Sequence, residues 1–234
     1  MHLFYTPDIS GNIHILDPQE SRHITRVLRL QDGDVIHLTD GKGALYESKI
    51  SNDHEKRCEV TVMDVVNDYG KRDTNIHIAI APTKNISRFE WFLEKAAELG
   101  IDEITPLVCE HSERTVIKPE RLNKVLVAAM KQSLKAYLPV LNPSVKFKVF
   151  MKASPAEQKF IAYVDEGITD HLKDVAQKGK DAVVLIGPEG DFSENELKMA
   201  IENAYQPISL GKSRLRTETA GIAACHILNL VNNQ

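Results

Sequence analysis

Residues 183–224 restrict the fold of this chain more than any other stretch, because they carry a strand, a glycine loop and a helix twice in succession. The first copy begins with the apolar run 183–186, which is typical of a strand buried on both faces of a parallel sheet. A loop at 187–190, with two glycines and a proline, ends this run. Ser193 and Glu196 then have the spacing of a capping box, which predicts that a helix starts there.

The second copy follows at once and indicates where a ligand would bind. Residues 207–210 form a short apolar run, Gly211 interrupts it, and residues 219–231 have the character of a buried helix. Loops at the carboxyl ends of neighbouring parallel strands face a common crevice, where open α/β sheets bind their ligands. Glycines would let backbone groups approach a nucleoside cofactor, although each glycine alone is equally consistent with a tight turn. Neither loop has the P-loop or GxGxxG pattern, which disfavours ATP and NAD.

Both copies resemble one protein family. The segments LIGPEGDFSENEL and ISLGKSRLRTETAGIAA are similar to those of the RsmE family of ribosomal RNA methyltransferases, which belong to the SPOUT class. The resemblance extends over nearly the whole chain. It implies methylation of N3 of a uridine in 16S ribosomal RNA, with S-adenosylmethionine bound in a deep trefoil knot. The sequence departs from the family at Asp191, where a second glycine is usual, and near Lys212 and Arg214, where a proline and an isoleucine are usual.

The resemblance also implies which residues bind the cofactor. Carried over position by position, they lie in the two loops and at the start of the last helix: Leu185, Ile186, Gly187, Pro188, Gly190, Leu210, Gly211, Leu215, Arg216, Thr217, Thr219 and Ala220.

Methylation at N3 requires an extruded base and the removal of a weakly acidic imide proton. Arg114, in the polar segment EHSER, is expected to stabilise developing charge on a carbonyl oxygen of the uracil. Glu189 is the first candidate for the proton acceptor and Glu218 the second. For either glutamate, cofactor binding or the capping of backbone N–H groups is the stronger alternative.

A basic stripe near the N-terminus predicts contact with RNA. Arg22, Arg26 and Arg29, with His23 beside them, fall on one face of a helix expected from a cap at Ser21 to about residue 30. Ile24, Val27 and Leu28 would take the buried side. The alternative is a solvated face paired with surface acids. The segment HITRVLRLQDGD resembles the PUA-like RNA-binding domain of the same family and favours RNA.

The predicted fold class is α/β, with a C-terminal SPOUT α/β trefoil-knot methyltransferase domain behind an N-terminal PUA-like β-barrel. The polar segment 67–73 is the expected linker, which gives an RNA-binding domain at 1–70 and a methyltransferase domain at 74–234. Strands expected at 74–81 and 104–108, on either side of a helix, predict a parallel sheet.

Finer elements of the second domain are also predicted. Ser87 and Glu90 have capping-box spacing, and Gly100 should end the helix between the two strands. A further strand is expected at 145–150. The neighbours Trp91 and Phe92 are interpreted as core or interface residues in preference to a base-stacking platform.

Composition limits the partners and the compartment. The net charge is −4, and residues 1–70 contain seven basic and twelve acidic side chains, so RNA contact must come from local patches. Three widely spaced cysteines and scattered histidines predict neither disulfides nor a metal site, and the absence of a long apolar run predicts no membrane span. The expected setting is cytoplasmic, and the expected partners are 16S ribosomal RNA or the small ribosomal subunit.

The family resemblance further implies a homodimer whose site borrows residues across the interface, with the helix at 219–231 as part of that interface. Two rival functions remain at this stage. One is a knotted methyltransferase acting on another RNA nucleotide, for instance in transfer RNA, and the other is a non-catalytic RNA-binding ribosome-assembly factor.

Overall fold

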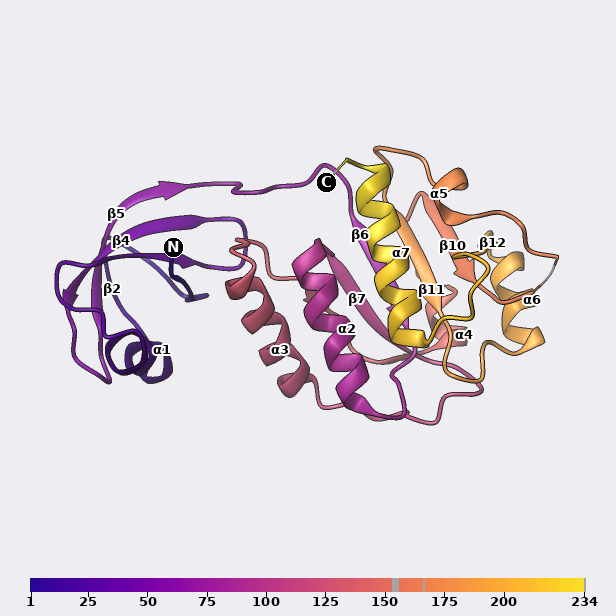
Figure 1. Ribbon diagram of the computed structural model, residues 1–234, viewed down its shortest axis with the longest axis horizontal. Coiled ribbons are helices and arrows are strands. Elements are labelled where there is room, and N and C mark those ends of the chain that lie inside the picture. The colour runs from indigo at the N-terminus through magenta and orange to yellow at the C-terminus, as the bar shows by residue number, and fades with distance from the viewer. Residues whose placement is uncertain (153–155, 166, 234) are drawn as a thin grey trace. The chain divides into compact units, whose positions relative to one another are not determined.

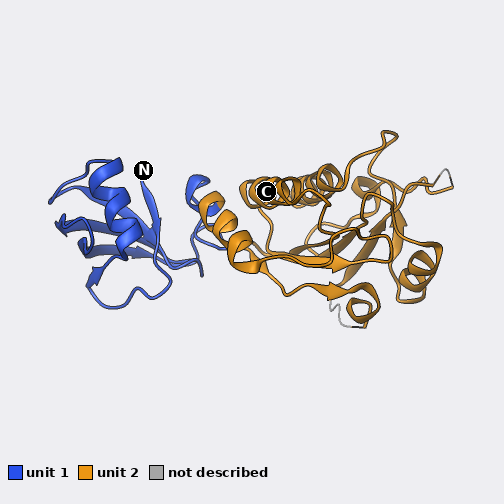
Figure 2. Ribbon diagram, turned by 90° about the horizontal axis from the view of Figure 1, so that it is seen from below, with its two compact units in different colours: residues 1–71, 130–138 blue, residues 72–129, 139–234 orange. Residues whose placement is uncertain are grey.

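The computed structural model describes residues 1–152, 156–165 and 167–233. The chain forms two compact units, coloured separately in Figure 2. The first comprises residues 1–71 and 130–138, and the second comprises residues 72–129 and 139–234. The boundary expected from the sequence would assign residues 130–138 to the second domain.

Residues 130–138 join the first unit through specific contacts. Gly43 N donates to Ala136 O, and Leu138 N donates to Gly41 O, both at 2.9 Å. Lys131 forms a largely buried ion pair with Glu20. In the sequence, residues 130–138 look like the continuation of the preceding helix. Local patterns therefore could not predict that they belong to the first unit.

The first unit is built on one curved sheet of five strands: β1 (Leu3–Tyr5), β2 (Ile13–Ile15), β3 (Val35–Thr39), β4 (Leu45–Asn52) and β5 (Glu59–Val66). Their order is β1-β3-β4-β5-β2, with β1 parallel to β3 and the remaining pairs antiparallel. The inward-facing side chains form one buried cluster, which consists of Phe4, Leu16, Ile24, Ile36, Leu38, Ile50, Cys58 and Val60.

The predicted N-terminal helix starts earlier than expected. It consists of α1 (Pro18–Arg22) and a wider π-helical turn, η1 (His23–Val27). Asp17 is the N-cap, because its side chain accepts from two backbone N–H groups of the first turn. The predicted cap at Ser21 was wrong: its hydroxyl is buried, donates to Leu16 O at 3.1 Å and accepts from Cys58 N at 2.9 Å.

The π-helical turn also changes which side chains face the solvent. Leu28 N bonds to His23 O, five residues back, so the turn is wider than that of an α-helix. Val27 is consequently 67% exposed, and its predicted place on the buried side was wrong. Arg29 has a φ of +57° and lies beyond the helix, so Arg22, Arg26 and Arg29 do not form the regular stripe that α-helical spacing predicted.

The second unit is built on a sheet in which every pair of neighbouring strands is parallel. Its strands are β6 (Ile76–Ile80), β7 (Glu103–Val108), β8 (Val140–Leu141), β9 (Val145–Lys146), β10 (Gln158–Ala162), β11 (Ala182–Ile186) and β12 (Gln206–Ile208). The order is β12-β10-β11-β6-β7-β8, and β9 pairs further along β7. The predicted parallel sheet is therefore confirmed, and the fully buried strands β6 and β11 lie at its centre.

The helices of this unit are α2 (Ile86–Leu99), α3 (Pro119–Gln132), α4 (Phe147–Phe150), α5 (Leu172–Val175), α6 (Glu194–Glu202) and α7 (Thr217–Val231). Helices α2 and α7 lie side by side over the sheet (Figure 1). Gly221 permits this approach: a Cβ atom there would lie 2.7 Å from the ring of Phe92. Phe92 is fully buried, whereas Trp91 is 43% exposed.

Several predicted helix ends are confirmed and others are wrong. The capping box of Ser193 and Glu196 is present, and Gly100 ends α2 with a φ of +109°. The N-cap of α2 is Asn85, whose side chain accepts from Ser87 N, because an asparagine two residues earlier satisfies the same orphan donors. The predicted strand at 145–150 is only β9, since the chain turns at once into α4.

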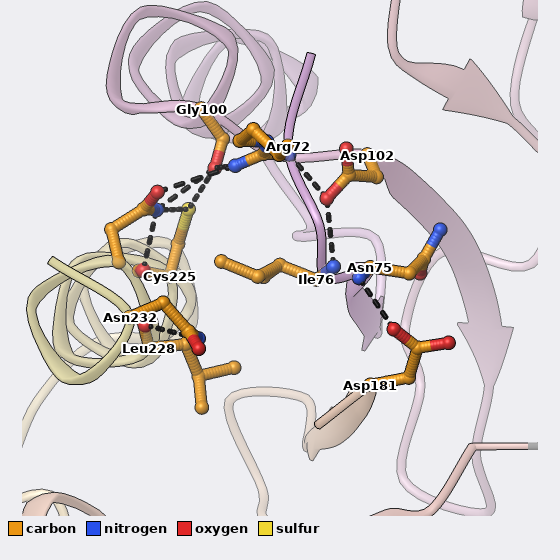
Figure 3. A network of polar contacts seen from close by, with 10 residues as sticks. Arg72, Asn75, Ile76, Gly100, Asp102, Asp181, Cys225, Leu228 and Asn232 are labelled. Atoms are coloured by element: carbon orange, nitrogen blue, oxygen red, sulfur yellow. Dashed lines mark hydrogen bonds and ion pairs between the residues drawn. The ribbon is translucent and has the colours of Figure 1, made fainter. Parts of the chain in front are cut away.

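A polar network fastens the amino-terminal edge of this sheet (Figure 3). Arg72 forms an ion pair with Asp102 and donates to Gly100 O at 2.6 Å. Asp102 in turn accepts from Ile76 N at 2.7 Å, and Asn229 of α7 donates to the same Gly100 oxygen at 2.8 Å. Because this edge is occupied by structural contacts, the opposite, carboxyl edge is left for the loops of the site.

Candidate active site

Three loops meet at the carboxyl edge of the sheet. The strands β12, β10 and β11 are parallel neighbours, so the segments that follow them leave the sheet on the same side. The loops after β11 and β12 are the two glycine loops expected from the sequence. The segment after β10 was missed, because it has no glycine pattern and is placed there only by strand order. The sequence therefore predicted two of the three loops at this edge of the sheet.

Hydrogen bonds join these loops. The buried hydroxyl of Thr217, at the start of α7, donates to the carbonyl of Gly187 at 3.0 Å. The segment after β10 is bound to the second loop, since Ser209 N donates to Asp170 O at 2.8 Å and Leu172 N donates to Ser209 O at 3.1 Å. Hydrogen bonds within the chain therefore hold these loops together.

The glycines have different roles in the two loops. A Cβ atom on Gly187 would lie 3.2 Å from the ring of Phe192, and one on Gly190 would lie 3.2 Å from His111 Cβ, so both are required for close packing. Gly211 has a φ of +120°, and an added Cβ would contact nothing within 4 Å. Its backbone therefore borders open space, and it is the loop glycine best placed for the approach of a ligand.

Asp191 holds the first loop in a conformation that favours glycine. Its φ is +61°, a region that aspartate tolerates better than most residues. One carboxylate oxygen accepts from Phe192 N at 2.8 Å, and the other accepts from Val164 N at 3.4 Å, which ties the loop to the segment after β10. Burial raises the pKa of this carboxyl, and these two hydrogen bonds oppose the rise.

Arg114 and Glu189 converge on residues 83–84, between β6 and α2. Arg114 Nε donates to Thr83 O at 3.0 Å, and its Nη2 donates to Lys84 O at 2.6 Å. Glu189 Oε1 accepts from Lys84 N at 2.9 Å, and the residue is exposed. The two side chains are therefore brought near the same backbone segment, and the carboxylate does cap a backbone N–H group.

Glu218, the second carboxylate, lies on the wall of a different depression. It is buried in the first turn of α7, with its Oε1 3.9 Å from Arg88 Nε. A groove of about 590 Å³ runs between the amino-terminal ends of α2 and α7, and we call it the α2–α7 groove. It is lined by Ser87, Arg88, Trp91, Arg214, Leu215, Arg216, Glu218 and Thr219. Three of the predicted cofactor residues, Leu215, Arg216 and Thr219, thus face this groove.

In the first unit, the predicted RNA-binding residues are only partly grouped. Arg22 and His23 line a shallow groove of about 460 Å³ together with Pro18, Gln19 and Val27. Arg26 forms an exposed ion pair with Glu55, with its Nε 2.8 Å from Oε2, and this hydrogen bond lowers the pKa of Glu55. The alternative of pairing with surface acids therefore holds for Arg26.

Within residues 1–152, 156–165 and 167–233, no cluster of three or more histidine, cysteine or acidic side chains could hold a metal ion. No helix in the same part of the chain is long and apolar enough to cross a membrane. The cysteines Cys58, Cys109 and Cys225 are free and buried, and burial raises the pKa of Cys58 to about 11.

Comparison with known families matches both units. Residues 71–229 match the family described as RNA methyltransferase domain, and residues 16–63 match the RNA methyltransferase PUA domain. The ribosomal RNA small subunit methyltransferase E of Aquifex aeolicus is 27% identical, over 97% of this chain and 99% of the relative. The protein of the same name from Synechocystis sp. is also 27% identical, over 92% of this chain and 72% of the relative.

Solved structures agree with this grouping. A probable rRNA-methyltransferase from Porphyromonas gingivalis is 43% identical, with a TM-score of 0.93 over 100% of this chain and 99% of that one. The ribosomal RNA small subunit methyltransferase E of Neisseria gonorrhoeae, bound to S-adenosyl methionine, is 27% identical, with a TM-score of 0.90 over 99% and 98%. The predicted fold class is confirmed as an N-terminal PUA-like domain followed by a C-terminal parallel α/β sheet that matches RsmE and SPOUT structures, and the trefoil knot stays a prediction. The chain therefore belongs to the RNA methyltransferase family, in the RsmE group of ribosomal RNA small subunit methyltransferases.

Proposed function

We propose that this protein transfers the methyl group of S-adenosylmethionine to N3 of a uridine in the 16S ribosomal RNA of the small subunit. The observation that carries the proposal is the set of loops that follow β10, β11 and β12 at the carboxyl edge of the sheet, with the bond from Thr217 to Gly187 joining the start of α7 to the first of the glycine loops. We take the crevice between these loops as the cofactor site. A relative of the same overall fold is bound to S-adenosyl methionine. RNA substrate and cofactor are consistent with the family of each unit.

The crevice fits the cofactor by its chemistry. Polar edges of an adenine and an amino acid are matched by backbone groups, which two glycine loops supply. Space is open on the side of Gly211 where a Cβ atom would lie, and its N–H and C=O groups are hydrogen-bonded to the hydroxyl of Ser209. In this proposal the cofactor is held by residues of the two loops and of the start of α7, namely Leu185, Ile186, Gly187, Pro188, Gly190, Leu210, Gly211, Leu215, Arg216, Thr217, Thr219 and Ala220. When bound, it supplies an electrophilic sulfonium methyl group.

The chain has to hold the uracil in line with this methyl group and remove the N3 proton. Arg114 is the proposed electrophile for a uracil carbonyl: its Nε and Nη2 are bound to the carbonyls of residues 83 and 84, which would fix the orientation of the guanidinium. Glu189 is the proposed proton acceptor, with one oxygen fixed by Lys84 N and the second available for the imide proton. Glu218 is the alternative acceptor.

The proposal includes a homodimer. The face of α7 turned away from the sheet is only partly covered and carries Ile222, Ala223, Ile227 and Leu230 around the exposed His226, and Leu230 is 58% exposed. A stripe of this kind suits a second copy of the chain. The proposed compartment is the cytoplasm, in which three free thiols are stable.

The first test is calorimetric titration of S-adenosylmethionine into the wild type and two variants of Gly211. Gly211→Ala adds only the strain of a positive φ, because its Cβ meets nothing, whereas Gly211→Trp also fills the space beside the loop. We expect measurable binding that alanine weakens and tryptophan abolishes. A wild type that binds no cofactor would favour the non-catalytic assembly factor.

The second test is mass analysis of nucleosides from 16S ribosomal RNA of a deletion strain. Loss of N3-methyluridine, restored by the wild-type gene, is the expected result. If a nucleoside of transfer RNA lost its methyl group instead, the alternative substrate would replace the proposed one.

A further inference from the structure

We propose that the α2–α7 groove binds the target nucleotide of a single-stranded RNA segment, with the base stacked on Trp91 and the flanking phosphates held by Arg88, Arg214 and Arg216. This inference rests on the proposed function, because it assigns the RNA site of the same enzyme.

The charge of the groove suits a polyanion. Three arginines and one glutamate line it, although the whole chain has a net charge of −4. Arg214 and Arg216 are exposed and form no ion pair with any residue that the structure describes. Arg88 Nε lies 3.9 Å from Glu218 Oε1, and the charge of Arg214 acts on Asp191, which does not line the groove. Three arginines against one glutamate nevertheless give the lining of the groove a net positive charge.

Trp91 supplies the surface on which a base can stack. It is 43% exposed at the groove, whereas Phe89, Phe92 and Leu93 on the same helix are fully buried. Stacking of a base on an aromatic side chain contributes about 1–3 kcal/mol, and nearby guanidinium groups also stack on bases and bind phosphates. Trp91 is therefore too exposed to be a core residue of this chain, whereas Phe92 is one, and the predicted alternative of an interface residue stays a prediction for Trp91.

The position of the groove links it to the cofactor crevice. Arg216 and Glu218 line the groove, and Thr217 between them is bonded to Gly187 in the first glycine loop. One turn of chain thus borders both sites. Residues 215–219 therefore connect the lining of the groove to the loops that are proposed to hold the cofactor.

A second copy of this chain is a poorer occupant. In a twofold contact the same patch faces itself, so a contact centred on the groove would set three arginines against three arginines. The apolar stripe on α7, defined by Ile222, Ala223, Ile227 and Leu230, offers a separate surface for dimerisation. The charge therefore favours RNA in the groove.

The natural probe is Trp91 itself, because it is the only tryptophan of the chain. Its fluorescence is to be titrated with a single-stranded eight-nucleotide oligouridylate carrying a terminal dye, whose anisotropy reports total binding in the same sample. We expect saturable quenching of Trp91 that parallels the anisotropy. Arg214→Ala and Arg216→Ala should each weaken binding about tenfold and reduce the salt slope by about 0.7, as the loss of one phosphate contact requires. Lys124→Ala, an exposed lysine of α3 outside the groove, is the matched control and should change neither.

Activity separates this inference from the proposed function. Trp91→Ala should lower methylation of 16S ribosomal RNA about 10-fold to 100-fold with an unchanged Kd for S-adenosylmethionine, and Trp91→Phe should recover most of it. Full activity of Trp91→Ala would overturn the groove assignment and leave the methyltransferase function standing. Anisotropy that rises without any quenching would place the RNA elsewhere, and emission that changes only on protein dilution would assign the groove to a second copy. A wild type without cofactor binding would instead contradict the proposed function, and quenching by RNA would still be measurable.

Discussion

Replacing Thr217 with valine removes one hydroxyl group from the site and keeps the branched shape of the side chain. That hydroxyl donates to the carbonyl of Gly187 at 3.0 Å, and the side chain is only 5% exposed. It is the direct hydrogen bond between the start of α7 and the first glycine loop. The substitution therefore tests whether this bond keeps the two walls of the crevice together.

The size of the effect follows from burial. In the variant, a buried carbonyl loses its donor, and leaving such a group unsatisfied costs about 1–3 kcal/mol. We expect a loss of about 2 kcal/mol in the free energy of unfolding, which lowers the Tm by roughly 4–8 °C in a chain of this size. If the joined loops are the state that binds cofactor, the same free energy corresponds to a Kd for S-adenosylmethionine raised up to about 30-fold.

The assay pairs thermal unfolding with calorimetric titration of S-adenosylmethionine. Thr217→Ser is the matched control, because it keeps the hydroxyl and loses one buried methyl group, worth about 1 kcal/mol. We expect serine to lose some stability and to retain cofactor affinity. The reasoning is refuted if valine binds the cofactor as the wild type does, or if serine weakens binding as much as valine.

Three further predictions concern other parts of the chain. Burial raises the pKa of Asp191, so its ionised form destabilises the fold at neutral pH. Asp191→Asn should therefore be more stable than the wild type at pH 7 in urea melts, and the difference should shrink as the pH falls through the raised pKa towards 3.8. Glu55→Gln releases Arg26 from its exposed ion pair, and should tighten binding of single-stranded RNA at low salt while the midpoint of urea unfolding stays close to that of the wild type. Gly221→Ala places a methyl group 2.7 Å from Phe92, and should destabilise by about 1–2 kcal/mol in urea melts because overpacking outweighs the gain in helix propensity.

Much of the fold was predictable because the signals are local. Strand β6, the capping box at Ser193 and the end of α2 at Gly100 are each set by residues within a few positions of one another. The misplaced helix starts have a physical cause. Asp17 and Asn85 are equally good caps, and tertiary contacts decide between neighbouring candidates: the Ser21 hydroxyl is taken by Leu16 and Cys58. The π-helical turn depends on such contacts as well, and residue spacing alone cannot reveal it.

The sequence predicted the loops of the site, but it did not predict which residues the side chains of the site would contact. Glycine positions and the run RTETA indicated the crevice, but the partners of Arg114 and Glu189 lie 30 and 105 residues away along the chain. The segment after β10 enters the site through strand order, and Trp91 reaches the groove through the packing of α2 beside α7. Contacts of this range depend on the whole sheet, so no local pattern encodes them.

Residues 216–218, at the start of α7, contact two different parts of the candidate site. Successive residues of a helix point about 100° apart, so neighbours in one turn face different surroundings. Thr217 faces the first glycine loop, whereas Arg216 and Glu218 face the α2–α7 groove. The proposed cofactor set and the groove thus share this short segment, including Arg216, whereas Thr217 does not line the groove. Substitutions at 217 should therefore act on cofactor affinity and leave RNA affinity unchanged, and substitutions at 216 should weaken RNA binding. If RNA affinity fell as far with a substitution at 217 as with one at 216, the turn would act as a single unit and the separation of Thr217 from the groove would be wrong.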